Sequence, residues 1–265
     1  MAITTMDQLV SAIASASFQA TEESSITSKG AGYFASLWQA AGRPGSGATP
    51  ATGAGAAPTN ATAGAIPYTN PGGANIGYLA KLLASSSNAE TLILYDRLVH
   101  TSGLSGTVTT AQTVNSTALT RYTAGTDVGL WLEWYTATGS TAVNVTASYT
   151  NQAGTSGQTT VSTALPASCP AGFTIPLPLA AGDTGVRSVQ SVTLSGTTGT
   201  AGNFGVTLGQ RIASLPLILA NVGVTFDWSQ VGLPQIANNA CLAWHVLCTT
   251  TSTGTILSEF CFAQG

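Results

Sequence analysis

Residues 143–150 (VNVTASYT) decide the expected fold, because their side chains alternate in polarity. The apolar set is Val143, Val145, Ala147 and Tyr149, and it alternates with Asn144, Thr146, Ser148 and Thr150. A β-strand places successive side chains on opposite faces, so this segment has one apolar and one polar face. Such alternation is typical of an antiparallel sheet that packs one face on a core.

Outward from this stretch, similar short segments are separated by turns rich in Gly, Ser and Thr. They are 91–99, 106–113, 128–136, 158–163, 173–179, 185–195, 202–208, 215–225, 241–250 and 255–262. Together they predict a mainly β protein, with an antiparallel β-sandwich or jelly-roll body over residues 91–265. Residues 166–172 (PASCPAG) are the candidate boundary if this body is subdivided.

Residues 1–90 are expected to form an extended N-terminal arm with short helices. Helical spacing of apolar residues predicts helices over 6–18, 29–41 and 76–85. Between them, five prolines interrupt a Gly/Ala/Thr-rich stretch, which excludes a long helix or a central strand there. We expect this stretch to lie on a surface of this chain or of a neighbour, with Trp38 and Tyr68 as aromatic contacts at a subunit interface.

The composition excludes several classes of protein. Only 17 of 265 residues are charged, the net charge is −3, and the mean hydropathy is +0.27. Disordered chains and nucleic-acid-binding proteins need more charge than this. No apolar run is long enough to span a membrane, and no basic segment precedes the first apolar residues, so no export signal is expected. A surface so poor in charge predicts a closed homo-oligomer, with a trimer preferred over a dimer.

Four charged residues lie in or beside apolar segments: Asp96, Arg97, Arg121 and Glu133. A charge in such surroundings usually belongs to a specific ion pair or an interface contact. Asp96 and Arg97 are neighbours in an expected strand, so they should point to opposite faces and pair elsewhere. Arg121 is the candidate partner of Glu133. Paired catalytic carboxylates are the less favoured alternative, and we expect no enzymatic activity.

The cysteines, His245 and a stripe of aromatic residues can each be interpreted either as part of the core or as part of a binding site. Cys169, Cys241, Cys248 and Cys261 lie in apolar surroundings and should be buried, reduced thiols. In residues 241–248 (CLAWHVLC), a helix would gather Cys241, His245 and Cys248 into a zinc site, whereas a strand would separate Cys248 from the other two. We favour a packed core histidine, and expect neither metal nor cofactor. The stripe of Trp131, Trp134 and Tyr135 is either core or a sugar-binding platform, with core preferred.

Several phrases of the chain are similar to those of a known group of proteins. They include SLWQAAGRPGSGATP (36–50), AGAIPYTNP (63–71), LTRYTAGTDVGLWLEWYTATG (119–139) and IPLPLAAGDTGVRSVQSVTLSGTTGTAG (175–202). Over residues 36–202 the chain resembles a family of tailed-bacteriophage virion structural proteins, in particular head decoration or cement proteins.

The resemblance implies a β-rich body on the capsid surface, made in the bacterial cytoplasm. Its partners would be the major capsid protein and other copies of itself, without nucleic acid or membrane. Such a protein would bridge capsid subunits and stabilise the head. The alternatives are a tail, fibre or baseplate module, or a glycan-binding β-sandwich for host attachment.

Overall fold

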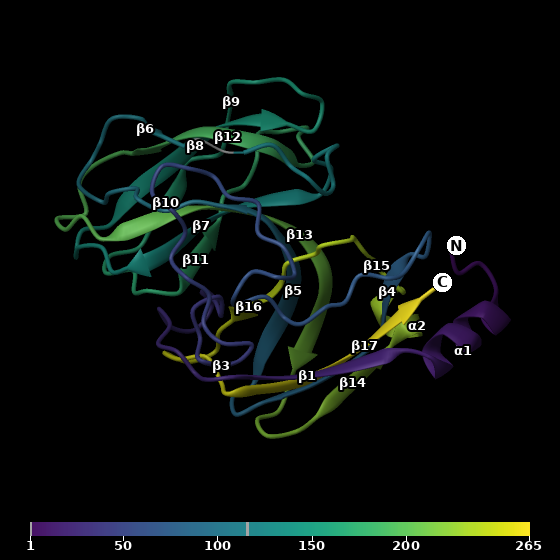
Figure 1. The fold of residues 1–265 in the computed structure, drawn as a ribbon. Helices are drawn as coiled ribbons and strands as arrows, with labels where there is room; N and C mark the ends of the chain where they lie inside the picture. Colours follow the sequence, from purple (N-terminus) through teal and green to yellow (C-terminus); the bar gives the residue numbers. More distant parts are fainter. Residues whose placement is uncertain (1, 115–116) are drawn as a thin grey trace.

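The computed structural model describes residues 2–114 and 117–265. The protein is mostly antiparallel β-structure in a sandwich-like arrangement, as the sequence predicts. The described residues include two helices, α1 (Met6–Ala14) and α2 (Trp228–Val231). The strands form a closed barrel with a separate sheet packed on each of two sides (Figure 1). This central barrel is a feature that the sequence pattern does not predict.

The barrel is the middle layer. In their order around the barrel, its strands are β11 (Phe173–Pro176), β2 (Phe34–Ser36), β16 (Leu242–Leu247), β5 (Glu90–His100), β13 (Asn203–Leu217) and β7 (Val128–Thr136). Pairing of β7 with β11 closes the ring. The longest strand, β13, pairs with β7 only through Gln210, and beyond it pairs with β5 alone. Its second half therefore extends out of the barrel wall.

One flanking sheet, which we call sheet I, contains the first and last strands of the chain. Its order is β14 (Val224–Asp227), β4 (Gly77–Ser86), β17 (Ile256–Gln264), β1 (Ser17–Glu23) and β3 (Gly42–Arg43), and β15 (Gln235–Ile236) also pairs with β4. Helix α1 packs on the outer face of this sheet through Ala12, close to Cys261.

The other flanking sheet, sheet II, is built from the middle of the chain. Its order is β10 (Thr163–Leu165), β8 (Val143–Asn151), β12 (Val186–Leu194) and β6 (Gln112–Thr113), and β9 (Gln158–Thr159) pairs with β8. In β8 the residues Val145, Ala147 and Tyr149 are buried, which confirms the alternation that decided the expected fold.

Two hydrophobic cores lie on the outer wall of the barrel. Core I, under sheet I, includes Leu79, Leu82, Leu92, Leu215, Trp244 and Phe260. Core II, under sheet II, includes Leu98, Leu132, Trp134, Tyr149, Val192 and Leu208. The strands β5 and β13 contribute side chains to both cores. In β13, the buried apolar residues up to Leu208 enter core II and those from Ala213 onward enter core I, and the two register shifts in its pairing with β5 lie between these two segments. Such irregularities re-aim side chains along a strand.

Two of the three expected helices are wrong. Residues 6–18 contain α1, but 29–41 contains the short strand β2, and 76–85 is almost entirely β4. In β4 a bulge leaves Ala80 without a partner in β17, so Leu79 and Leu82 both enter core I. Their spacing of three therefore imitates a helix. The expected strand 215–225 is also wrong, because β13 runs to Leu217 and a loop precedes β14.

Residues 1–90 are more than an arm. The strands β1 and β4 flank β17 on its two sides, so this part of the chain supplies the neighbours of the last strand of the body. The extended stretch between β3 and β4 does match the expected arm in conformation. It crosses the barrel beside β5 and β16, where Ala56 and Ile66 form isolated bridges. The division into units at residue 90, and that at 166–172, remain predictions.

Candidate functional site

The interior of the barrel contains charged and aromatic side chains instead of a purely aliphatic filling. Arg97 from β5, Glu133 and Trp131 from β7, Thr207 from β13 and His245 from β16 all point inward. The rings of Trp131 and His245 are 4.8 Å apart, although their strands are not neighbours in the wall. The contact therefore crosses the barrel.

Arg97 and Glu133 form the ion pair at the centre of this interior. The Arg97 Nη2 atom is 2.6 Å from the Glu133 Oε2 atom, and the same nitrogen donates to the Tyr135 hydroxyl at 3.0 Å. Arg97 Nε donates to His100 Nδ1 at 2.9 Å. The Thr207 hydroxyl donates to Glu133 Oε2 at 2.6 Å. Each charge therefore has a partner of opposite sign and further hydrogen bonds, as a buried charge requires.

The surroundings fix the charge state of these groups. Burial raises the pKa of Glu133, but the adjacent Arg97 outweighs this effect and lowers the pKa to about 2. Burial lowers the pKa of His245 to about 4 and that of His100 to about 3. At neutral pH this group of residues thus contains one anion, Glu133, one cation, Arg97, and two neutral imidazoles.

A second ion pair lies on the opposite face of β5. Arg121 binds the Asp96 carboxylate with two hydrogen bonds, from Nε at 2.9 Å and from Nη2 at 2.8 Å. The backbone N–H of Cys241 donates to the same carboxylate at 2.9 Å. Burial raises the pKa of Asp96, and the bonds from Arg121 oppose this shift. The expectation that Asp96 and Arg97 point to opposite faces and pair elsewhere is confirmed.

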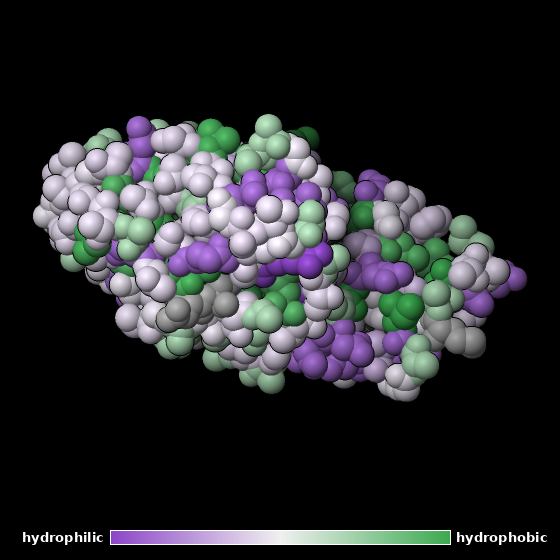
Figure 2. All heavy atoms as spheres, turned by 90° about the horizontal axis from the view of Figure 1, so that it is seen from above, coloured by the Kyte–Doolittle hydropathy of each residue, from purple (hydrophilic) through white to green (hydrophobic). Residues whose placement is uncertain are grey.

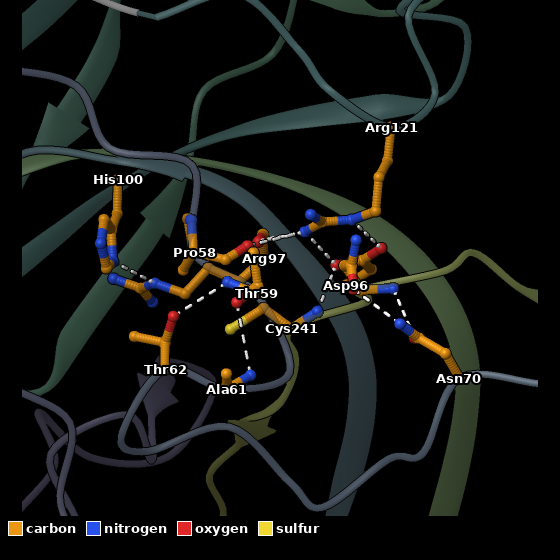
Figure 3. A network of polar contacts seen from close by, with 11 residues as sticks. Pro58, Thr59, Ala61, Thr62, Asn70, Asp96, Arg97, His100, Arg121 and Cys241 are labelled. Carbon is orange, nitrogen blue, oxygen red and sulfur yellow. Dashed lines mark hydrogen bonds and ion pairs between the residues drawn. The ribbon is translucent and has the colours of Figure 1, made fainter.

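The arm covers this part of the barrel (Figure 3). Arg121 Nη2 also donates to the Pro58 carbonyl at 3.0 Å. Trp38 lies over the Arg97 guanidinium, with 4.5 Å between the guanidinium carbon and the ring centroid, and its Nε1 donates to the Ala48 carbonyl. Gly47 lies against the Trp38 indole, where a Cβ atom would clash. The missing side chain of Gly47 lets the arm close over the indole.

All six residues expected at a subunit interface are buried within this one chain. None of Trp38, Tyr68, Asp96, Arg97, Arg121 and Glu133 is more than 7% exposed. Tyr68 packs edge-on against Phe262 of sheet I. The expected pairing of Arg121 with Glu133 is wrong, because each of these residues pairs with a different neighbour on β5. The expected interface contacts are thus contacts between the arm, the barrel and the sheets of a single subunit.

Tyr135, Thr207 and His100 belong to the network, but the sequence analysis does not predict their contacts with Arg97 and Glu133. For Tyr135 a signal exists: in β7 the buried core residues Leu130, Leu132 and Trp134 alternate with the interior set that contains Glu133. Tyr135 is two residues from Glu133 and hence shares its face. Thr207 is brought in by strand pairing over a long sequence distance, for which the sequence pattern gives no signal. His100 lies on the same strand as Arg97, three residues away, and the register shift of β5 between Arg97 and Val99 is likewise not visible in the sequence pattern.

The remaining candidate residues also lie in the interior. Residues 242–247 form β16, so the strand interpretation of CLAWHVLC is confirmed. The described residues contain no group of three or more His, Cys, Asp or Glu arranged to hold a metal ion. All four cysteines are buried and free, as expected. Trp131, Trp134 and Tyr135 are buried, which supports the core interpretation over a sugar platform.

The surface shows a different kind of candidate site. Figure 2 shows mostly residues of intermediate hydropathy, with hydrophobic groups also exposed among them. The large apolar side chains that are exposed in the described residues are Met6, Val10, Phe18, Tyr33, Leu83, Val108, Val161, Ile218, Leu219, Val222 and Leu257. Three of them lie in the loop between β13 and β14, where Ile218 is 77% and Leu219 59% exposed. Neither helix of the described residues has the length and apolarity that a membrane crossing needs.

No protein-family model matches the chain. No curated protein matches it in sequence. Among solved structures, it is similar to that of infectious bursal disease virus Gt strain, with 11% identity over 94% of this chain and 81% of the other, at a TM-score of 0.19. The VP2 subviral particle of the same virus has 11% identity over 94% and 80%, at a TM-score of 0.18. At these TM-scores the likeness establishes neither a common fold nor a function.

Proposed function

We propose that this chain is a non-enzymatic virion structural protein of a tailed bacteriophage, which binds the outside of the capsid as a cement or decoration protein. It would bridge major capsid subunits and associate with copies of itself. Opening the shell would then also require breaking the contacts made by this protein. The sequence resemblance over residues 36–202 suggests this role.

The observation that carries the proposal is the apolar loop between β13 and β14. Ile218, Leu219 and Val222 are exposed together at one end of the molecule, on a chain with few charges. Exposed apolar groups gathered in one place are typical of surfaces that bind another protein. The charges at the centre of the molecule are meanwhile committed to two internal ion pairs. The molecule thus has apolar surface to contribute to an assembly.

The test compares particles with and without the protein. Particles depleted of it should release their genome at a lower temperature than complete particles, and adding the protein back should restore the difference. The variant Ile218→Ser/Leu219→Ser should fold but fail to restore it. The matched control is Val108→Ser/Val161→Ser, which changes two exposed side chains beside sheet II. Depleted particles of unchanged heat resistance that fail to adsorb to host cells would instead favour the attachment alternative.

A further inference from the structure

The strand β1 has a free edge. It pairs with β17 along its whole length, from Ser17 to Glu23, without a register shift. On its other side, β3 covers only Glu22 and Glu23. In the described parts of the chain no strand pairs with the outer edge of residues 17–21.

The hydrogen-bonding groups on this edge can be assigned from the neighbouring pairs. Ser24 N–H donates to the Ala41 carbonyl on the β3 side of the strand. Because alternate residues of an antiparallel strand direct their N–H and C=O groups to the same edge, Ala20 and Phe18 also direct theirs outward. Two residues of this edge thus offer donors and acceptors to a further strand.

The other sheet edges of the described residues are short, or their longer unpaired stretches contain a charge, a proline or a register shift. The free edge of β13 beyond Gln210 has Arg211 and Pro216, and β12, which β6 covers only at Ser191 and Val192, has Arg187 and two register shifts. The strands β6, β9 and β3 have two residues each, β10 has three, and β14 has four and continues into α2. Natural proteins also protect edge strands with lysine, proline or bulges. Residues 17–21 (SFQAT) contain no charge and no proline, and Phe18 is 55% exposed. This edge therefore lacks the usual protection.

We propose that the free edge of β1 pairs antiparallel with β1 of a second copy of this chain, about a two-fold axis at Gln19. In this register the large Phe18 of one copy lies opposite the small Ala20 of the other. Residues 17–21 of one copy lie opposite residues 21–17 of the other, and none of them is charged, so no two like charges face each other. The pairing ends before Glu22, because β3 occupies the same edge there. A two-fold contact uses the same surface on both copies, and this strand is complementary to itself in that arrangement. The inference does not depend on the proposed virion role.

The first experiment is light scattering of the purified full-length protein and two variants. The wild type should have twice the chain mass of 26.6 kDa. Ala20→Pro removes an N–H group that points out of the sheet, a position where proline is tolerated, so this variant should fold and be monomeric. Leu257→Lys is the matched control, because Leu257 is similarly exposed, at 51%, but lies on the face of sheet I away from the edge. It should remain dimeric.

The second experiment keeps the proposal testable if Ala20→Pro does not fold. Gln19→Cys places a thiol next to the same thiol of the second copy, at a non-hydrogen-bonded pair where the Cα atoms are about 4.5 Å apart. Mild oxidation should give a covalent dimer linked through residue 19, because the four native cysteines are buried. Thr225→Cys, exposed on β14 at the opposite edge, should not cross-link.

Several outcomes would overturn the proposal. A monomeric or trimeric wild type would do so, as would a dimer that Ala20→Pro leaves intact. Loss of the dimer in Leu257→Lys but not in Ala20→Pro would assign the contact to the sheet face instead of its edge. A wild type that binds another virion protein through β1 but does not pair with itself would also refute pairing of two copies.

Discussion

The two sheets cover the same barrel, but they are assembled in different ways. Sheet II takes its strands from residues 112–194, whereas sheet I joins strands from both ends of the sequence. Their surfaces differ too. Of the exposed large apolar side chains in the described residues, Met6, Val10, Phe18, Leu83, Ile218, Leu219, Val222 and Leu257 lie on the sheet I side. The other three, Tyr33, Val108 and Val161, lie beside sheet II. Sheet I, whose paired strands are furthest apart in the sequence, is thus also the side of the molecule that exposes most of the large apolar side chains.

The largest expected effect on stability concerns the ion pair inside the barrel, on whose outer wall both cores pack. Arg97→Ala leaves the Glu133 carboxylate buried without its cation, which costs about 3–5 kcal/mol of unfolding free energy. Because both cores rest on the barrel, we expect both to be lost in a single transition. Urea unfolding followed by tryptophan fluorescence and by circular dichroism measures this.

The control for this prediction is an ion pair at the surface. Arg43 and Glu22 are 3.6 Å apart, with side chains 78% and 46% exposed. Arg43→Ala should change the unfolding free energy by less than about 1 kcal/mol. If Arg97→Ala and Arg43→Ala lowered the unfolding free energy equally, the interior ion pair would be no more important for stability than the surface pair.

A matched pair of substitutions on β13 separates the two cores. Leu208 lies in core II and Leu215 in core I, and both are fully buried. Replacement of either by alanine should cost about 2–5 kcal/mol. Amide hydrogen exchange should accelerate in β8 and β12 for Leu208→Ala, and in β4 and β17 for Leu215→Ala. Identical exchange patterns would mean that the two cores open as one unit.

Glu23 should give sheet I a pH dependence of its own. Glu23 of β1 is buried, its Oε2 atom has no hydrogen-bond partner among the described residues, and burial raises its pKa to about 8. The folded state keeps this proton while the unfolded chain loses it near the ordinary pKa of 4.5. The stability contribution of Glu23 is thus complete below pH 4.5 and is lost as the pH rises to about 8.

The variant Glu23→Gln isolates this effect. The unfolding free energy of this variant, relative to that of the wild type, should increase between pH 4.5 and about pH 8 by at most about 1.4 kcal/mol per pH unit. Above this range the difference should remain constant. Thermal unfolding of both proteins from pH 4 to pH 9 measures the difference. A constant difference over this range would show that Glu23 has an ordinary pKa.

The smallest effect is a difference in cysteine reactivity. Cys261, on the outer face of sheet I, packs in the cluster that α1 covers, whereas Cys169 lies in core II. Burial raises the pKa of both thiols. Fraying of a nine-residue terminal helix requires less free energy than opening a core. Mass spectrometry after alkylation should therefore find Cys261 modified before Cys169, and the reverse order would contradict a labile α1.

The sequence predicts the strands best where a strand has one buried and one exposed face. This condition holds for β8, but not for β4, where the bulge at Ala80 gives two leucines a helical spacing. It also does not hold for the barrel strands, whose two faces are both buried, as in β5 and β7. The scarcity of charge correctly singled out Asp96, Arg97, Arg121 and Glu133. Their partners depend on which strands are neighbours around the barrel, and the chain order does not encode this locally.

The pairing of β1 with β17 has a consequence for synthesis of the protein. More than 200 residues separate the two strands, so at 5–20 residues per second β1 leaves the ribosome on the order of ten to forty seconds before its partner exists. During this interval β1 and β4 have no β17 between them, whereas β8 and β12 of sheet II can already pair. A charge-poor strand waiting in this state can pair with other nascent chains on the same messenger. Codon usage between the segments that encode β1 and β17 sets the length of this interval and should therefore affect the yield of folded protein.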